Sequence, residues 1–213
     1  MPGGPRTHTR TALPRRSLLA AVPLLGLAAC TGGDDTNRVN EINRDRFVSG
    51  DGSNYRWEDP GDRPEAPVVT GESLTGEPLD TADWAGSIVV MNFWGSWCPP
   101  CRSEAEYLVE AHEHFAEQNQ GSSEGRDVEF VGVNIRDTVD AALAFEQRYG
   151  VTYPSFDDAS GAIALQFVDY DISPTTIPAT FVIDREQRVF SVWREDFKDA
   201  ETLIADVNQV LEQ

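Results

Sequence analysis

The sequence predicts an α/β fold in which a mixed β-sheet carries helices on both faces. Three observations support this prediction. Two nearly continuous apolar runs, at 87–94 and 128–135, are typical of strands covered on both faces. A segment with helical periodicity follows each run, at about 99–118 and 138–149. Later, two apolar strands flank a polar turn, which predicts a hairpin and therefore a sheet that is not all parallel.

The first thirty residues are predicted to be an export signal. Arginines precede a twelve-residue apolar stretch at 18–29, which is too short to span a bilayer, since a helix needs about twenty residues to do so. The run Leu-Ala-Ala-Cys ending at Cys30 is typical of lipoproteins. We expect a signal peptide at 1–29, a lipid on Cys30 and a flexible tether at 30–44. The alternative is an ordinary signal peptide with a chance cysteine.

The route of export stays open, because the pair Arg15-Arg16 followed by Ser-Leu-Leu also resembles a twin-arginine signal. Two arginines that fall together by chance in a basic leader explain the pair equally well.

The composition is that of a strongly acidic globular protein. Of 213 residues, 40% are hydrophobic and 25% charged, and the formal net charge is -19. Such a surface repels nucleic acid and anionic lipid headgroups, and no basic patch overrides it. We therefore expect no nucleic-acid partner. The acidity either favours basic partners or serves solubility.

A small hairpin is predicted on the N-terminal side of the domain. Short apolar runs at 47–48 and 55–57 flank the turn 50–52, and a second turn-rich connector covers 61–66. The buried strand at 87–94 then leads through Gly-Ser-Trp-Cys into the helix that begins at Pro99.

The second half completes the sheet. After the strand at 128–135, the helix at 138–149 carries apolar residues at helical spacing, and a short helix is expected at 160–167. Strands at 179–184 and 189–193 form the late hairpin, and a helix at 201–211 closes the chain. The domain is predicted to span 45–213.

The chemistry is predicted to reside in two cysteines. If Cys30 carries lipid, only Cys98 and Cys101 remain, separated by two residues at the start of a helix. There the sulfurs are close enough to bridge, and the amides and dipole of the helix favour a Cys98 thiolate that attacks a partner's disulfide. Cys101, one turn deeper, resolves the mixed disulfide.

The alternative for such a pair is half of a zinc site. Zinc in a structural site takes four ligands, and the chain has no second cysteine pair. His112 and His114 are two apart on the predicted helix, so they point to different faces. We expect no metal and no organic cofactor.

The two prolines between the cysteines are predicted to tune the redox couple. Neither Pro99 nor Pro100 has an N–H, so only the Cys101 amide remains to stabilise the thiolate. A less stable thiolate means a more reducing couple. Glu104, expected in the same first turn, acts in the same direction by charge repulsion, and Arg102 opposes it.

The residues from Val90 to Glu104 resemble the active-site segment of the ResA/TlpA group of thioredoxin-like proteins. Segments at 131–134, 149–154 and 176–184 are similar to further parts of that group, so the resemblance covers the chain from about Pro67 onward. It implies a thioredoxin fold with an inserted strand-helix element.

The resemblance also implies roles for further residues. Pro178 is expected to be cis and to stand against Cys98, and the Ile177 backbone is expected to pair with an extended client peptide. Trp97, beside the sulfur that we expect to be exposed, forms part of the docking surface. Glu104 corresponds to an acidic residue that tunes the thiols and transfers protons. The alternative for Glu104 is a residue favoured only by the helix dipole.

Asn92 stands where thioredoxin itself has a buried aspartate, which favours the ResA/TlpA group over thioredoxin proper. This leaves Glu104 as the only nearby candidate base.

The function implied by the resemblance is reduction outside the cytoplasm. Lipid-anchored members of the group reduce the heme-attachment cysteines of apocytochrome c, with electrons from a membrane thiol transporter. We expect this chain on the extracytoplasmic face of the cell membrane. One alternative is an oxidase that forms disulfides in exported proteins. Another is a redox-inert binding lipoprotein on the same fold, against which the intact Cys98–Cys101 pair argues.

Overall fold

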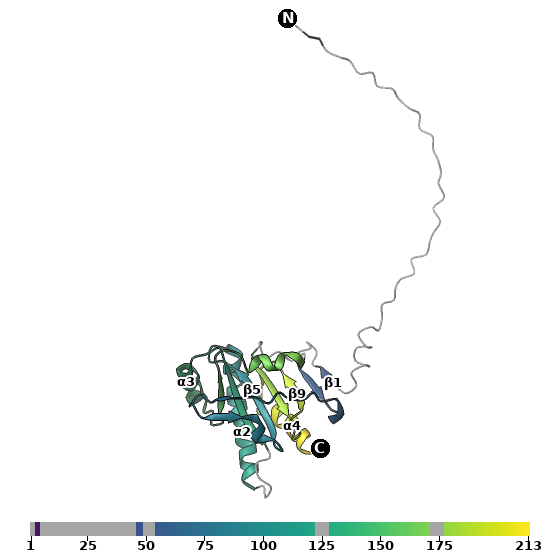
Figure 1. The fold of residues 1–213 in the computed structure, drawn as a ribbon, viewed down its shortest axis with the longest axis vertical. Coiled ribbons are helices and arrows are strands. Elements are labelled where there is room, and N and C mark those ends of the chain that lie inside the picture. The colour runs from purple at the N-terminus through teal and green to yellow at the C-terminus, as the bar shows by residue number, and fades with distance from the viewer. Residues whose placement is uncertain (1–2, 5–45, 49–53, 122–127, 171–176) are drawn as a thin grey trace, which may run out of the picture.

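The computed structural model describes residues 3–4, 46–48, 54–121, 128–170 and 177–213 (Figure 1). The strands are β1 (Arg46–Val48), β2 (Tyr55–Trp57), β3 (Thr70–Glu72), β4 (Pro78–Asp80), β5 (Ile88–Trp94), β6 (Val128–Ile135), β7 (Ser155–Asp158), β8 (Ala179–Ile183) and β9 (Val189–Trp193). The α-helices are α2 (Pro99–Gly121), α3 (Val139–Tyr149) and α4 (Ala200–Leu211), and the 3-10 helices are η1 (Pro60–Asp62), η2 (Thr81–Trp84) and η3 (Ala164–Tyr170). The predicted signal peptide, Cys30 and the tether lie outside the described residues.

Within the described residues, one mixed sheet has the strand order β1-β2-β9-β8-β5-β6-β7. β5, β6 and β7 run parallel, whereas β8 is antiparallel to both β5 and β9. In the β5–β8 register, Phe93 lies opposite Ala179. Because the two strands run in opposite directions, the chain that enters β8 lies beside the chain that leaves β5. The topology thus brings Pro178 to the dithiol.

One face of the sheet is covered by α-helices. Ile88 and Val90 of β5 pack there with apolar residues of α2 and α4, namely Leu108, Phe115, Leu203, Val207 and Val210. α3 extends this layer, since Phe145 stacks on Trp94 with ring centroids 4.4 Å apart. Because side chains alternate along a strand, Val89, Met91 and Phe93 of β5 face the opposite side.

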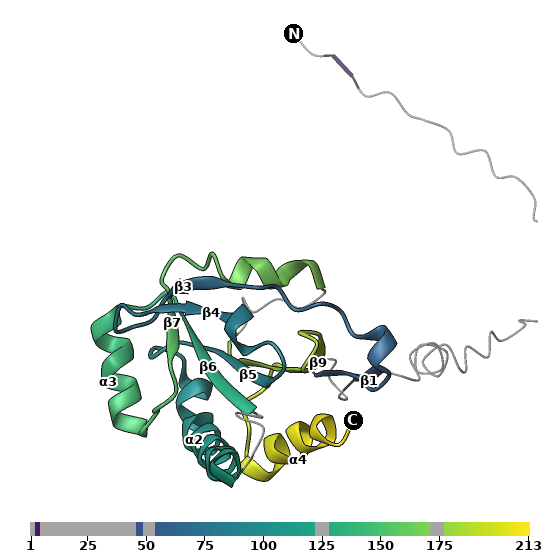
Figure 2. The ribbon, with the colours of Figure 1, turned by 60° about the horizontal axis from the view of Figure 1, so that its bottom comes forward.

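The opposite face is covered by 3-10 helices and connecting segments. Phe93 meets Phe167 of η3 and Phe181 of β8 in edge-to-face contacts. Figure 2 shows η3 on the side of the sheet away from α2 and α4. Helices therefore lie on both faces, as the sequence predicts, but the second layer is made of 3-10 helix rather than α-helix.

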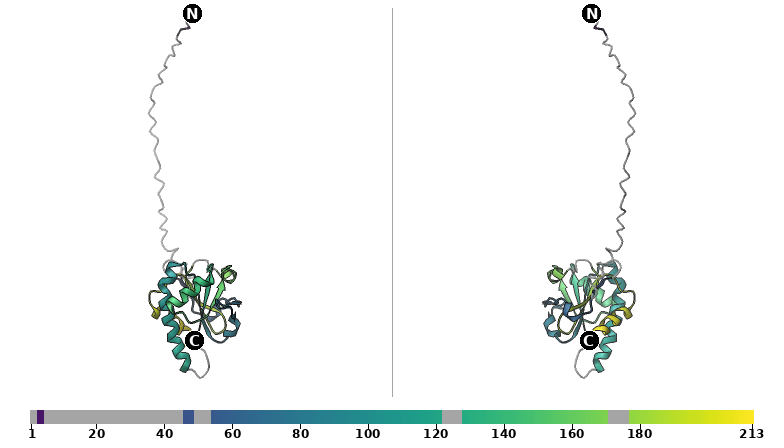
Figure 3. Two further views of the ribbon diagram at one scale, coloured as in Figure 1. Left: turned by 90° about the vertical axis from the view of Figure 1, so that its left-hand side faces the viewer. Right: turned by 90° about the vertical axis from the view of Figure 1, so that its right-hand side faces the viewer.

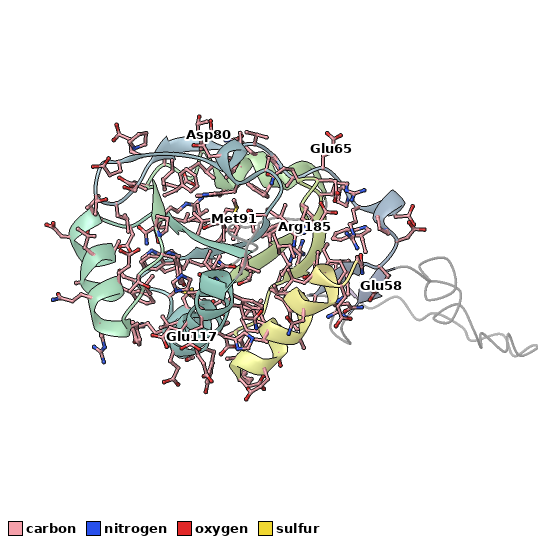
Figure 4. All side chains as sticks on the ribbon, turned by 90° about the horizontal axis from the view of Figure 1, so that it is seen from below. Glu58, Glu65, Asp80, Met91, Glu117 and Arg185 are labelled. Carbon is pink, nitrogen blue, oxygen red and sulfur yellow. A yellow bond between two sulfur atoms is a disulfide. The ribbon has the colours of Figure 1, made fainter. Side chains whose placement is uncertain are left out.

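The acidic residues lie mostly outside this layered core. In Figure 4, Glu58, Glu65, Asp80 and Glu117 lie at the periphery, whereas Met91 lies between the layers and is fully buried. α2 is the longest helix of the described residues, and its far end projects beyond the sheet (Figure 1, Figure 3).

Most of the predicted elements are confirmed. β5, β6, β8, β9, α2, α3 and α4 begin and end within about three residues of the predicted bounds. Thr138 caps α3, since its side chain accepts from the Ala141 N–H, and Gly150 ends the helix in a left-handed conformation. The N-terminal hairpin also forms: β1 pairs with β2, and β2 extends the sheet along β9.

Three elements differ from the prediction. The hairpin of β3 and β4 was not expected, because its short strands contain Gly71 and Pro78 and too few apolar residues to show a period. β7 was not expected either, since its four residues form an edge strand defined by its parallel pairing with β6. The helix predicted at 160–167 was wrong at its start: Ser160 precedes a turn, and η3 begins at Ala164.

Candidate active site

The two cysteines lie where β5 ends and α2 begins. β5 ends at Trp94 and α2 begins at Pro99, so Cys98 occupies the N-cap position and Cys101 lies in the first turn. A disulfide joins Cys98 to Cys101, with Cα atoms 5.3 Å apart. This Cα separation lies within the usual range of disulfides. The structure thus brings together the pair that the sequence singled out.

The Cys98 sulfur takes the place of an N-cap acceptor. The backbone N–H of Cys101 donates to Cys98 Sγ over 3.2 Å, as the third helical residue does to an N-cap side chain. Pro99 and Pro100 fill the first two helical positions and have no N–H to donate. Of these three residues, Cys101 alone can stabilise a Cys98 thiolate through its amide, which is the geometry that the sequence predicts.

Neither sulfur-bearing side chain is open to solvent in the disulfide form. Cys98 and Cys101 are each only 2% exposed, whereas Trp97 is 52% exposed. The expectation of an exposed Cys98 sulfur was therefore wrong for this state. The physical reason is packing, since the disulfide belongs to a buried cluster with Trp94, Ala105 and Phe145.

The peptide bond between Ile177 and Pro178 is cis, as the resemblance implies. The Ile177 carbonyl oxygen lies 3.8 Å from Cys98 Sγ, and Pro178 is buried. The entry to β8 therefore stands directly against the first cysteine. Ile177 itself stays partly exposed beside it.

Glu104 lies behind the disulfide, in the interior. It is the sixth residue of α2 rather than part of the first turn, so the expected first-turn placement was wrong. Cys101 and Glu104 are three apart on the helix, and such residues share a face. The Glu104 side chain is fully buried, where its two oxygens accept from Asn92 Nδ2 at 3.1 Å and from the Phe197 N–H at 3.2 Å.

Burial changes the charge of this carboxyl group. Removal from water raises the pKa of Glu104 to about 8, against the hydrogen bonds from Phe197 and Asn92, which favour the charged form. Nearby Asp196 raises this pKa further, and Lys198 lowers it. Glu104 is thus largely protonated at pH 7. Charge repulsion of the thiolate, as the sequence suggested, therefore needs a pH above about 8.

A shallow apolar groove lies on the outer side of the dithiol. It is lined by Trp97, Ile135, Arg136, Ser160, Gly161, Ala164, Leu165 and Ile177. Leu165 is 60% exposed and Trp97 is 52% exposed, so both sides of the groove carry exposed apolar surface. The Trp97 ring lies over Gly95, where an added Cβ would come 2.8 Å from the indole nitrogen.

A profile of the AhpC/TSA family matches residues 63–192, which include the dithiol, Glu104 and Pro178. The match covers more than half of the chain. The chain belongs to the AhpC/TSA family. Its fold is thioredoxin-like, with α3 and β7 inserted between β6 and β8.

Relatives of this family member include thiol-disulfide oxidoreductases called ResA. The ResA protein of Bacillus subtilis is 35% identical over 129 residues, which are 60% of this chain and 64% of that protein. The ResA protein of Bacillus thuringiensis is 30% identical over 125 residues, 59% of this chain and 65% of that protein. The chain thus spans less than two thirds of the length of these relatives.

Solved structures with the same fold include two from corynebacteria. A DsbF homologue from Corynebacterium diphtheriae is 32% identical with a TM-score of 0.65, and the match covers 76% of this chain and 96% of that one. A secreted thiol-disulfide isomerase from Corynebacterium glutamicum is 27% identical with a TM-score of 0.68, covering 79% and 98%.

Three residues around the dithiol of this AhpC/TSA member were not predicted from the sequence. Leu165 was assigned only to a short helix, although an exposed leucine there was a usable signal. Asp137, whose carboxylate accepts from the Ser96 N–H at 2.6 Å, follows a strand and carries no motif. Phe197 acts through its backbone N–H, so its side-chain type gives no sequence signal.

His112 and His114 lie in α2, more than two turns from the dithiol. His112 packs edge-on against Phe130 and Tyr153, and burial lowers its pKa. His114 accepts or donates a hydrogen bond with Gln118. In the parts of the chain that the structure describes, no group of three or more histidine, cysteine or acidic side chains could hold a metal ion. Among those residues, no helix is long and apolar enough to cross a membrane.

Proposed function

We propose that this chain is an extracytoplasmic thiol-disulfide oxidoreductase that reduces disulfides of exported proteins. One observation carries the proposal: Cys98 is the N-cap of α2, it is joined to Cys101, and its Sγ lies 3.8 Å from the Ile177 carbonyl oxygen at the entry to β8. A disulfide that only staples the chain would need neither the helix N-terminus nor the buried acid behind it. The similarity to ResA proteins supports the same function.

The exchange proceeds in two steps that conserve electrons. In the dithiol form, the Cys98 thiolate attacks one sulfur of a client disulfide, and the other client sulfur leaves as a thiolate. Cys101, as thiolate, then attacks Cys98 Sγ and releases the second client sulfur. The client gains two electrons and two protons, and the chain is left in the Cys98–Cys101 disulfide form. An external dithiol must supply two electrons to restore it.

We assign proton exchange with Cys101 to Glu104, which lies three residues further along α2 on the same face of the helix. Burial raises the pKa of Glu104 to about 8, so near neutral pH both its protonated form and its carboxylate form are available for proton transfer. The carboxylate form accepts the Cys101 proton before the second step. In the reverse direction, protonated Glu104 returns a proton to the departing Cys101 thiolate.

The client docks on the outer side of the dithiol. The Ile177 backbone offers strand-like hydrogen bonds to an extended segment, while Trp97 and Leu165 offer apolar surface for the client's neighbouring side chains. Because Cys98 is 2% exposed, client binding has to displace part of this surface before sulfur meets sulfur.

We assign the chain to the reduction of client disulfides rather than to their formation. Pro99 and Pro100 withhold two amides from the Cys98 thiolate, which destabilises the reduced form and makes the couple a stronger reductant. On this basis the clients include apocytochrome c with oxidised heme-attachment cysteines, and a membrane thiol-electron transporter supplies the electrons. The competing assignment is an oxidase of exported proteins.

The N-terminal segment sets the place of action in this proposal. Residues 1–29 serve as a signal peptide, Cys30 carries lipid, and 30–44 tether the domain at the outer face of the cell membrane. Mass spectrometry of the mature N-terminus tests this part separately. A mature chain that begins elsewhere than at a lipid-modified Cys30 removes the anchor from the proposal.

The direction is tested by the reduction potential of the Cys98–Cys101 couple, measured by equilibration in thiol buffers. A potential at or below about -270 mV is expected for a reductant, whereas a potential near about -120 mV would assign the chain to the oxidases. Insulin reduction with dithiothreitol as electron donor tests activity itself. A chain that reduces no insulin and forms no mixed disulfide is instead a redox-inert binding protein.

A further inference from the structure

The loop between β6 and α3 holds the loop that carries the dithiol. The Asp137 carboxylate accepts from the Ser96 N–H at 2.6 Å, and the Ser96 hydroxyl also bonds to it. Asn134 Nδ2 donates to the same oxygen, Oδ2, at 3.4 Å, and the other oxygen, Oδ1, accepts from the Thr138 N–H at 2.9 Å. The carboxylate is thus fixed from several directions, and these bonds hold the pKa of Asp137 below its usual range.

The same loop holds Trp97 at a second point. The indole Nε1–H lies 3.3 Å from the Ile135 carbonyl and 3.2 Å from the Arg136 carbonyl, so it donates to both. Arg136 has a φ of 51°, in the left-handed region that an arginine seldom adopts. The Arg136 carbonyl accepts from the indole N–H in this conformation, and Asp137 follows as the next residue.

These contacts influence the position of the Cys98 sulfur, because only a few residues of chain separate Asp137's partner Ser96 from Cys98. Ser96 lies two residues before Cys98, and the Cys98 N–H donates back to the Gly95 carbonyl at 3.0 Å. The segment from Gly95 to Cys98 is therefore a closed turn whose middle is held by Asp137. A shift of the Ser96 peptide moves Cys98 relative to both Cys101 and the Ile177 carbonyl.

We propose that Asp137 is a positioning residue for the dithiol, which orients the Ser96–Cys98 turn for closure of the disulfide and for client attack. The inference rests on the proposed oxidoreductase function and adds a residue to it. Loss of the contact frees the turn in the dithiol form, which makes disulfide closure less favourable. The reduction potential of the couple then becomes less negative.

The test compares four variants of the full chain. Asp137→Ala removes the acceptor, whereas Asp137→Asn keeps one carbonyl oxygen for the Ser96 N–H. Asp140→Ala is the matched control, because Asp140 is an exposed acid at the start of α3 with no part in the turn. Thr138→Ala removes the cap of α3 and controls for lost stability in the same loop.

Three quantities are measured: kcat/KM for insulin reduction, the reduction potential, and Trp97 fluorescence, taken as the difference from the Trp97→Phe form of each variant. We expect Asp137→Ala to lower kcat/KM by about 10- to 100-fold, as for a reacting group displaced by about 1 Å. The potential becomes less negative, and the Trp97 emission changes. Asp137→Asn recovers most of the activity, while Asp140→Ala resembles the wild type.

Two outcomes overturn the inference. If Asp137→Ala keeps the wild-type potential and kcat/KM, Asp137 positions nothing. If Thr138→Ala shifts both quantities as much as Asp137→Ala does, the effect is only loop stability. Should Asp137→Ala not fold, Asp137→Ser decides, because its side chain is one atom too short to reach the Ser96 N–H; an unchanged potential and unchanged Trp97 emission in Asp137→Ser refute the inference. Failure of the proposed function is a separate result, because then the wild-type chain reduces no insulin.

Discussion

The two sides of the Cys98–Cys101 disulfide differ in almost every physical respect. On the inner side, Glu104 and Asn92 lie at 0% and 4% exposure, with their polar atoms paired to each other, to Thr180 and to the Phe197 N–H. On the outer side, Trp97 and Leu165 are more than half exposed.

The two sides of the disulfide are therefore suited to two different tasks, although only a few residues of chain lie between them. The inner side excludes water, so it can shift the pKa of a carboxyl group to a useful value, as water would not allow. The outer side leaves apolar area exposed to solvent, which is the surface that the proposed client would cover. The predictions below test whether the tasks are separable, from the largest expected effect to the smallest.

The largest effect is expected at the sulfurs, which both sides share. Cys98→Ser should reduce insulin-reducing activity to the uncatalysed level, because the nucleophile is lost. Cys101→Ser should also stop turnover, but it should trap client proteins on Cys98 as mixed disulfides visible by non-reducing electrophoresis.

The control for the sulfur variants is Cys30→Ser. It removes the cysteine outside the predicted pair and should retain full reducing activity in the purified chain. Trapping by Cys98→Ser in place of Cys101→Ser would reverse the assignment of the two thiols.

The inner side is probed by Glu104→Gln. We expect a loss of roughly 100-fold in the rate of client reduction, within the range of general acid-base catalysis. In the wild type the rate should rise as pH increases toward about 8, where Glu104 becomes a carboxylate. The variant should lose this rise. Glu106→Gln, an exposed residue of the same helix, is the matched control and should leave the profile unchanged.

Glu104 also predicts how stability depends on pH. Its pKa is 4.5 in the unfolded chain and about 8 in the fold, so between these values the folded state binds more protons. The free energy of unfolding should therefore fall as pH rises from 4.5 to 8, by up to about 1.4 kcal/mol per pH unit. Urea titrations at several pH values check this. An equal slope in Glu104→Gln would assign the dependence to other groups.

The outer side is probed by Trp97→Ala and Leu165→Ala. Removing exposed apolar contact area should raise KM for a disulfide-bearing peptide by about 10-fold for the tryptophan and less for the leucine. The Glu104-dependent pH profile should not change. Val68→Ala removes another exposed apolar side chain, outside the groove, and should leave KM unaltered. A changed pH profile in Trp97→Ala would show that the two tasks are coupled.

The smallest effect is expected from Arg102→Ala. Arg102 is exposed at the start of α2, so solvent screens its attraction for the Cys98 thiolate. Thiol titration should show the pKa of Cys98 raised by a few tenths of a unit at most, on the scale of surface charge effects. Arg148→Ala, an exposed arginine in α3, is the control. A shift above about one unit would place Arg102 in the redox machinery.

An element of the fold can be predicted from the sequence when its own residues carry the pattern, and is missed when a distant segment defines it. The long strands were predicted because each of them buries both faces and reads as a run of apolar residues, as at Val90. β7 was missed because its pairing with β6, rather than its own composition, makes it a strand. The late start of η3 was missed because the Asp158 side chain holds the N–H groups of Ile163 and Ala164 in a turn.

The sequence by itself determined the chemistry of the site. Cys98 and Cys101 are three apart, and the first-turn geometry of a helix lets such cysteines bridge and lets the prolines between them withhold amides. These are local properties, fixed within four residues of chain.

Only the tertiary structure decided the state of Glu104 and the surroundings of Cys98. The pKa of Glu104 depends on burial and on hydrogen bonds from Asn92 and Phe197, which lie 12 and 93 residues away in the chain. The cover over Cys98 comes from Ile177, 79 residues away. Desolvation and long-range packing depend on segments that are far apart in the sequence, so neither produces a local sequence pattern from which it could be predicted.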